Sequence, residues 1–284
     1  MKEIELIKND NEINDLIKNN GLSDKYVEEH LSVFMRVYQS REKCKDCKGL
    51  SMCNQLSRGQ RLSLNYEGVL LEEIEFCEYA LTKRKKEKLL SKYAYCDIAP
   101  NLVDLDLNNV EYTEDQKQLY LRLAAILHGL SDRGLFISGD LGVGKTYLCT
   151  ALANSLVKQG KKVAFVKVAN FFNEMKSFFG SNSEQIDRNI AILKNVEYLF
   201  LDDIGSESVS EFVRDDILFR ILDYRLENKL ITIFTSNLNK EELLKHYQYD
   251  RKEKSNLMNA RRLLERIDIM TDNYVMSGKN MRRV

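Results

Sequence analysis

The most constraining feature of the sequence is the segment 139–146, GDLGVGKT, which matches the pattern G-x-x-x-x-G-K-[ST]. It follows the apolar run GLFIS and precedes the helix-like stretch TYLCTALANSLVKQG. A glycine-rich turn between a strand and a helix can aim backbone N–H groups and the positive end of the helix at phosphate oxygens. The sequence therefore predicts a phosphate-binding loop, with an ordinary glycine turn as the minor alternative.

The side chains of this loop have separate predicted roles. Lys145 would neutralise the β- and γ-phosphates of a nucleotide, and Thr146 would offer its hydroxyl to Mg²⁺. The predicted cofactors are therefore ATP or ADP with Mg²⁺. The residues expected to surround the nucleotide are Gly139, Asp140, Leu141, Gly142, Val143, Gly144, Lys145, Thr146 and Tyr147.

Two further strand-like runs end in polar side chains. The run 198–201, YLFL, is followed by Asp202 and Asp203, and Asn237 closes the run 230–237, LITIFTSN. Side chains alternate along a strand, so the two acids are predicted to do different work. Asp202 would hold Mg²⁺ through water, and Asp203 would position the attacking water. Asn237 could orient water against the γ-phosphate; on the residues alone, a turn-forming role is nearly as well supported.

Strand-like and helix-like segments alternate through the C-terminal two thirds of the chain. This alternation predicts an α/β fold, with a mostly parallel sheet covered by helices on both faces. A capping-box motif at Thr113 predicts a helix before the first strand. The predicted strands are 134–138, 162–168, 197–203, 230–237 and, more weakly, 268–276.

The pattern of the N-terminal third instead predicts a smaller, mainly helical domain over residues 1–95. A linker is predicted at 96–112, around the lone Pro100, and the nucleotide-binding domain at 113–284. Ser23 is the predicted N-cap of one helix. The basic run 82–92 is predicted to be a solvated helix face, with a binding patch as the alternative.

Five of the six cysteines also fall in the first third of the chain. Four thiolates are the number that a closed tetrahedral zinc site requires, and the CxxC spacing is typical of such sites. Unligated thiols are the alternative, and Cys96 is the substitute for Cys53 as the fourth ligand. The predicted ligands are Cys44, Cys47, Cys53 and Cys77.

Composition limits the possible partners. Lys and Arg number 43, and Asp and Glu also number 43, so any binding to nucleic acid must rely on a local patch. Hydrophobic residues at 44% and charged residues at 30% exclude a fibrous or disordered chain. Without a signal peptide or an apolar run long enough for a membrane span, we expect a cytoplasmic protein that does not bind membranes.

The segments GDLGVGKTYL, YLFLDDIGSES, TIFTSN and NARRLLERI occur in this order. In these segments the chain resembles the AAA+ ATPase domain of the bacterial replicative helicase loaders and of the related IstB transposition ATPases. The resemblance covers about residues 100 to 284 well and the N-terminal third more loosely. It implies a P-loop AAA+ domain without a long C-terminal lid, weak ATP hydrolysis used as a switch, and delivery of a hexameric replicative DNA helicase.

The same resemblance implies partners. They are single-stranded DNA, other primosome proteins and further copies of the chain when ATP or helicase is bound. It also implies an N-terminal zinc-binding domain that docks on the helicase. DNA contacts carried over from the loaders fall on Lys176, Phe179, Ser210 and Phe212, although the aromatic residues are more often core residues than stacking surfaces.

A trans-acting arginine is implied as well, reaching the γ-phosphate of a neighbouring subunit, and the matching residue is Arg266. A second sensing arginine matches Arg283, with Arg282 as its alternative. Seen from the residues alone, Arg262 and Arg266 lie on the helix face opposite Leu263, where a solvated stripe is the other interpretation.

Two other functions remain open at this stage. An IstB-like transposition accessory ATPase would bind duplex DNA and lack the zinc module. A small-molecule P-loop kinase would need no arginine from a partner subunit.

Overall fold

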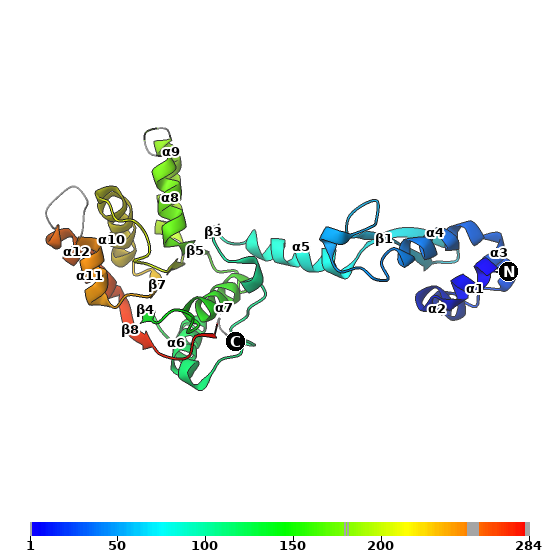
Figure 1. Cartoon of the computed structure of the whole chain (residues 1–284), viewed down its shortest axis with the longest axis horizontal. Coiled ribbons are helices and arrows are strands. Elements are labelled where there is room, and N and C mark those ends of the chain that lie inside the picture. The colour runs from blue at the N-terminus through cyan, green and yellow to red at the C-terminus, as the bar shows by residue number, and fades with distance from the viewer. Residues whose placement is uncertain (1, 179, 181, 249–255, 282–284) are drawn as a thin grey trace. The chain divides into compact units, whose positions relative to one another are not determined.

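The computed structural model describes residues 2–178, 180, 182–248 and 256–281. The chain divides into two compact units, Met1–Glu87 and Lys88–Val284 (Figure 1). No helix among the described residues is long and apolar enough to cross a membrane.

The N-terminal unit combines helices with a two-stranded hairpin. Its core is formed by buried side chains of the first helices, including Ile7, Val27 and Phe34. Ser23 accepts a hydrogen bond from the backbone N–H of Tyr26 and caps a helix, as predicted. The elements are α1 (Lys2–Asn9), α2 (Asn11–Asn19), α3 (Asp24–Glu29), α4 (Leu31–Glu42), η1 (Leu50–Met52), β1 (Gln60–Tyr66), β2 (Leu70–Phe76) and α5 (Glu78–Leu90), which continues past Glu87.

Helices predominate in this unit, as predicted, and the hairpin is an element that the sequence analysis did not predict. β1 and β2 pair in antiparallel register, from Gln60 opposite Phe76 to Tyr66 opposite Leu70. Leu62, Leu64 and Leu70 pack against the helical core. In β2 the sequence LEEIE breaks the apolar alternation, which is why the strand pattern is hard to recognise.

The C-terminal unit confirms the predicted α/β class. Its sheet has six parallel strands in the order β3-β5-β6-β7-β4-β8. In chain order the elements are β3 (Tyr95–Cys96), η2 (Pro100–Leu102), η3 (Glu114–Gln116), α6 (Lys117–Leu127), β4 (Gly134–Gly139), α7 (Lys145–Lys158), β5 (Val163–Lys167), α8 (Val168–Phe178), α9 (Ser183–Asn195), β6 (Tyr198–Asp202), η4 (Phe212–Phe219), α10 (Arg220–Glu227), β7 (Ile231–Ser236), α11 (Lys240–Gln248), α12 (Leu257–Met270) and β8 (Thr271–Met276).

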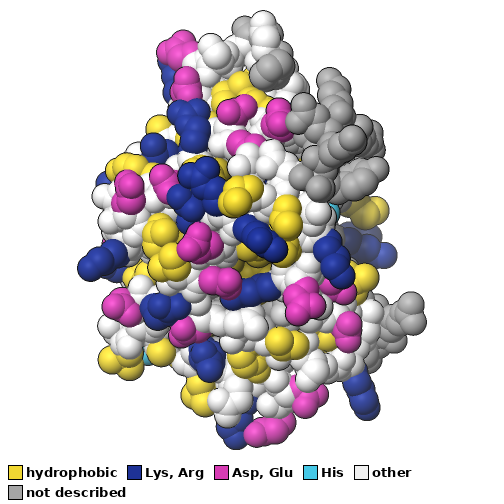
Figure 2. All heavy atoms as spheres, turned by 90° about the vertical axis from the view of Figure 1, so that its left-hand side faces the viewer, with side chains coloured by type: hydrophobic (Ala, Val, Ile, Leu, Met, Phe, Trp, Pro, Cys, Tyr) yellow, Lys and Arg dark blue, Asp and Glu magenta, His cyan; other side chains and the backbone are white. Residues whose placement is uncertain are grey.

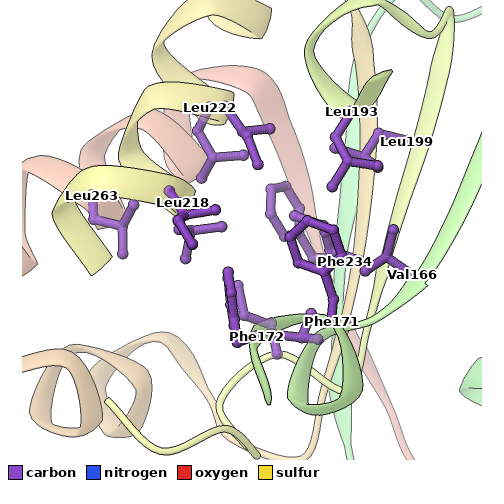
Figure 3. Close-up of a cluster of buried hydrophobic side chains, with 14 of the residues drawn as sticks. Val166, Phe171, Phe172, Leu193, Leu199, Leu218, Leu222, Phe234 and Leu263 are labelled. Atoms are coloured by element: carbon purple, nitrogen blue, oxygen red, sulfur yellow. The ribbon is translucent and has the colours of Figure 1, made fainter. Parts of the chain in front are cut away.

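Helices cover both faces of this sheet, and each face has its own core. Adjacent strand residues point to opposite faces, so Phe234 belongs to one core and Ile233 to the other. The first core also contains side chains of α8, α9, η4, α10, α11 and α12, and the second contains those of α6 and α7. Figure 3 shows Leu218, Leu222 and Leu263 gathered around the phenylalanines of the first core.

Residues 96–112, which the sequence suggested as a linker, lie within the C-terminal unit. Cys96 pairs with Phe165 in the sheet, and Val103 and Leu107 are buried. The side-chain amide of Asn154 on α7 donates to the carbonyls of Leu102, Val103 and Leu105. The structural division between the units therefore falls near residue 87, inside a helix.

Candidate nucleotide-binding site

The predicted phosphate loop connects β4 to α7, which begins at Lys145. Its first and last glycines occupy backbone conformations that other residues rarely adopt, with φ of 148° at Gly139 and 105° at Gly144. A Cβ on Gly139 would lie 2.0 Å from the carbonyl oxygen of Met276. The glycines therefore allow close approach of the loop to β8 and place the N-terminus of α7 behind it.

Lys145 joins the loop to the end of strand β7. Its ammonium donates to the carbonyls of Gly139 and Asp140, at 2.7 and 2.8 Å, and to Oδ1 of Asn237, at 2.9 Å. The structure thus brings together two residues that are 92 positions apart in sequence. Both were predicted to face the γ-phosphate, and a phosphate could replace the oxygens that now surround the ammonium.

The two acids at the end of β6 do have different environments. Oδ1 of Asp202 accepts hydrogen bonds from the hydroxyls of Thr146, at 2.8 Å, and Thr235, at 2.7 Å. Asp202 is buried, and this burial is the main cause that raises the pKa of its carboxyl group. The charge of Asp203 raises the pKa further. The two hydroxyl hydrogen bonds and the charge of Lys167 lower it, and the net shift is upward.

Thr146 and Asp202 are therefore neighbours, as the predicted magnesium site requires. Mg²⁺ takes oxygen ligands and typically binds one or two carboxylates together with phosphates and water. A hydroxyl and a carboxylate oxygen 2.8 Å apart at the phosphate loop fit that donor set.

Asp203 turns away from this pair towards Asn237. Its carboxylate accepts a hydrogen bond from the side-chain amide of Asn237 at 2.7 Å, and its φ is 61°. A left-handed backbone is uncommon for residues other than glycine, and such strain occurs often at functional sites. Here the conformation places the second carboxylate beside the predicted water-orienting amide.

The residue pattern gave no role to two side chains that support the site, Thr235 and Gln116. The hydroxyl of Thr235 holds Asp202 and also accepts from the backbone N–H of Asp203, at 2.9 Å. The side chain of Gln116 donates to the carbonyl of Val143, at 2.8 Å, and accepts from the N–H of Thr113. The capping-box motif and the polar end of β7 were the signals that could have indicated them.

The chain after β8 also contacts the loop. The N–H of Met281 donates to the carbonyl of Gly142, at 3.0 Å, and the side chain of Asn280 lies where a Cβ of Gly142 would point. Arg283 and Arg282, the predicted sensing arginine and its alternative, lie outside the described residues.

Arg266 is held by neighbouring helices. Its Nε and Nη2 lie 2.8 and 2.7 Å from Oδ1 of Asp223 on α10, and its guanidinium carbon lies 4.0 Å from the centre of the Phe219 ring. These contacts are within one chain, so the predicted role towards a neighbouring subunit remains a prediction.

The predicted DNA contacts are partly brought together. The ammonium of Lys176 donates to the carbonyl of Ser208, two residues before Ser210. Ser210 caps the following turn by accepting from the N–H of Val213, and Phe212 packs against the core. Phe179 lies outside the described residues.

The structure does not support the predicted zinc site. Among the described residues, no three His, Cys, Asp or Glu side chains gather in a way that could hold a metal ion. Each of three predicted ligands instead has a hydrogen bond to a protein group: Cys44 with the amide of Gln55, Cys47 with the carbonyl of Gly49, and Cys53 with the N–H of Gly59. The bond from Gly59, followed by one from Gln55, lowers the pKa of the Cys53 thiol.

The chain is similar to two curated replicative helicase loaders. The chain is 27% identical over 98% of its length to the replicative helicase loader DnaI of Bacillus subtilis, covering 91% of that protein. It is 33% identical over 108 residues to the replicative helicase loader DnaC of Escherichia coli, which is 38% of this chain and 44% of DnaC.

Among solved structures, the crystal structure of a DnaI matches with 30% identity and a TM-score of 0.56, over 68% of this chain and 98% of the other. The family model of IstB-like ATP-binding proteins matches residues 51–282, which include the phosphate loop, the acid pair and Asn237. The chain therefore belongs to the family of IstB-like ATP-binding proteins.

Proposed function

We propose that this protein is an ATP-dependent loader of the replicative DNA helicase. A phosphate loop is shared by many enzymes, so it does not by itself select this function. The observation that carries the proposal is the match to the B. subtilis helicase loader, because it extends through the N-terminal unit and nearly the whole of both chains. The N-terminal unit is then the part that binds the helicase, and the C-terminal unit binds ATP and single-stranded DNA.

The geometry supports ATP hydrolysis in steps that use this chain's own residues. Lys145 would exchange its three oxygen partners for phosphate oxygens. Thr146 and Asp202 would hold Mg²⁺, which neutralises charge on the phosphates when bound. Asp203, which accepts a hydrogen bond from Asn237, would align the attacking water.

Hydrolysis would be completed by a second copy of the chain. Arg266 of a neighbouring subunit would neutralise charge that develops on the transferred phosphoryl group. A loader needs affinity that depends on the bound nucleotide more than rapid turnover, because a ligand shifts an equilibrium only through differential affinity. We therefore expect slow hydrolysis that acts as a switch, in a complex that includes the helicase and other primosome proteins.

A direct test mixes the full chain with the hexameric replicative helicase of the same organism, with ATP, with ADP and without nucleotide. Size-exclusion chromatography with light scattering should show a defined complex whose amount depends on the nucleotide. The variant Lys145→Ala should lose that dependence. A protein that binds ATP but forms no complex under any of the three conditions would contradict the proposal.

The match to IstB-like ATP-binding proteins supports a second candidate function, that of an accessory ATPase of transposition. Such a protein would bind duplex DNA and a transposase. The two functions are separated by adding duplex DNA and helicase to the same sample. Stable duplex binding without helicase binding would favour the transposition function.

A further inference from the structure

Arg266 is fixed by residues from two preceding elements. Asp223 on α10 accepts from the guanidinium, and Phe219, the last residue of η4, lies against its face. The Arg266 side chain keeps 17% of its surface exposed, and that of Asp223 keeps 39%. Figure 2 shows a face of the molecule on which basic and acidic side chains are mixed, without a large area of one sign.

The hydrogen bonds leave part of the guanidinium available. Nε and Nη2 both approach the same oxygen of Asp223, and Nη1 donates to the carbonyl of Arg262 at 2.9 Å. A guanidinium has five N–H groups. The contacts to described residues use three of them, which leaves one N–H on each terminal nitrogen. Two such donors on one planar group suit the oxygens of a phosphate.

The three elements that carry Phe219, Asp223 and Arg266 are η4, α10 and α12, and they pack against one another. Leu218, Leu222 and Leu263, from η4, α10 and α12, are buried in one core cluster (Figure 3). About two turns before Arg266 on α12, Asn259 donates to Asp215 of η4 at 3.2 Å. η4 is a π-helix, a rare element that is frequently found at functional sites. The three elements therefore hold the ring and the carboxylate in fixed positions relative to α12.

We propose that Asp223 and Phe219 are positioning residues for Arg266. They hold the guanidinium so that its two remaining N–H groups meet the γ-phosphate of a nucleotide bound to a neighbouring copy. An arginine that is free to rotate must be ordered at the moment of reaction, which costs conformational entropy. This inference rests on the proposed function, because it takes Arg266 to act on a partner's nucleotide.

The test compares Asp223→Ala with Asp223→Asn in ATP hydrolysis. The assay uses saturating ATP, a single-stranded oligonucleotide and protein concentrations at which the specific activity of the wild type rises. Asp223→Ala should lower kcat about tenfold while KM for ATP stays within about twofold. Asp223→Asn should lose less, because its amide oxygen can accept the bonds that now end on Oδ1. Asp187→Ala, which removes an exposed ion pair with Arg220 of α10, is the matched control.

Further variants separate positioning from folding. The double variant Asp223→Ala/Arg266→Ala should be no slower than Arg266→Ala alone, because the carboxylate acts only through the arginine. Adding the Lys145→Ala protein to Asp223→Ala should restore hydrolysis, since the added subunits supply a correctly held Arg266. A protein that was merely misfolded would not be rescued in this way.

Several results would overturn the inference. If Asp223→Ala is as fast as the wild type or faster, the ion pair is dispensable or restrains the arginine instead of positioning it. If Arg266→Ala is slow and Asp223→Ala is not, the positioning role alone fails. If Arg266→Ala hydrolyses ATP at the wild-type rate, the trans arginine of the proposed function fails with it.

Discussion

Asp202 places a charged group where the fold alone would favour a neutral one. Its carboxyl is buried at 4% exposure, its pKa is raised mainly by that burial, and Thr146 and Thr235 both donate to one of its oxygens. Burying an ionised carboxylate costs free energy that two neutral hydrogen bonds offset only in part. This cost is consistent with a residue retained for metal binding instead of stability.

Asp202→Asn should therefore stabilise the nucleotide-free protein while abolishing magnesium-dependent hydrolysis. The amide oxygen can accept both hydroxyl hydrogen bonds, and the charge is removed. We expect a gain of about 1 kcal/mol in the free energy of unfolding at neutral pH, measured by urea denaturation. A variant that is less stable than the wild type at neutral pH would show that the carboxylate is well solvated in the folded chain.

The pH dependence of this difference has a defined sign. The folded-state pKa of Asp202 lies above its ordinary value of 3.8. Between those two values the folded chain binds the proton more tightly than the unfolded chain, so the stability of the wild type falls as the pH rises through the folded-state pKa. The advantage of Asp202→Asn should shrink as the pH is lowered through that pKa and disappear in more acid solution.

The local motifs made most of these residues predictable. The spacing in 139–146 defines Lys145 and Thr146, and an apolar strand ending in two acids defines Asp202 and Asp203. Thr235 was not assignable, because its role depends on β7 lying beside β6. A neighbour relation between strands is tertiary, and no spacing along the chain encodes it.

At the scale of elements, Arg225 of α10 connects the end of α9, the segment before β6 and the start of β7. It is fully buried, and its guanidinium donates to carbonyls of Leu193, Val196 and Ile231 and to the hydroxyl of Thr232. Burial lowers its pKa to about 9, so it remains charged at neutral pH. It therefore satisfies carbonyls where α9 ends and β7 begins.

Arg225→Met should destabilise the C-terminal unit by about 3 kcal/mol or more, because it leaves several buried carbonyls without a donor. Chemical unfolding with an unchanged denaturant slope would measure this loss. Arg188→Met on α9 is the control, since Arg188 forms an exposed i,i+4 ion pair with Glu184, and its effect should stay within about 0.5 kcal/mol. Equal effects of the two substitutions would contradict the role assigned to Arg225.

The elements that the sequence predicts well are those with strong periodic patterns. The central strands of the sheet fall within a residue or two of the predicted runs, because parallel strands buried on both faces are continuously apolar. β3 has only two residues, and the weak run predicted at 268–276 proved to be the end of α12 followed by β8. The π-helix η4 depends on packing between helices, for which the sequence carries no recognised signal.

At the scale of the whole molecule, each unit has an apolar core of its own. The N-terminal core is built from residues such as Ile7, Ile17 and Phe34, and none of the four predicted zinc ligands belongs to it. The residues of the candidate nucleotide-binding site all belong to the C-terminal unit. Ligand that binds one folded unit stabilises that unit by mass action.

We therefore expect two transitions when the full chain is heated in a calorimeter. Mg·ATP at about one hundred times its Kd should stabilise the transition of the C-terminal unit by about 2.7 kcal/mol and leave the other nearly unchanged. Lys145→Ala, heated under the same conditions, should abolish the shift. The variant Cys44→Ser/Cys47→Ser should keep both transitions, because the N-terminal core is formed without these thiols. If this variant loses the N-terminal transition and the wild type contains one zinc per chain by elemental analysis, the cysteines hold a metal that this unit needs in order to fold.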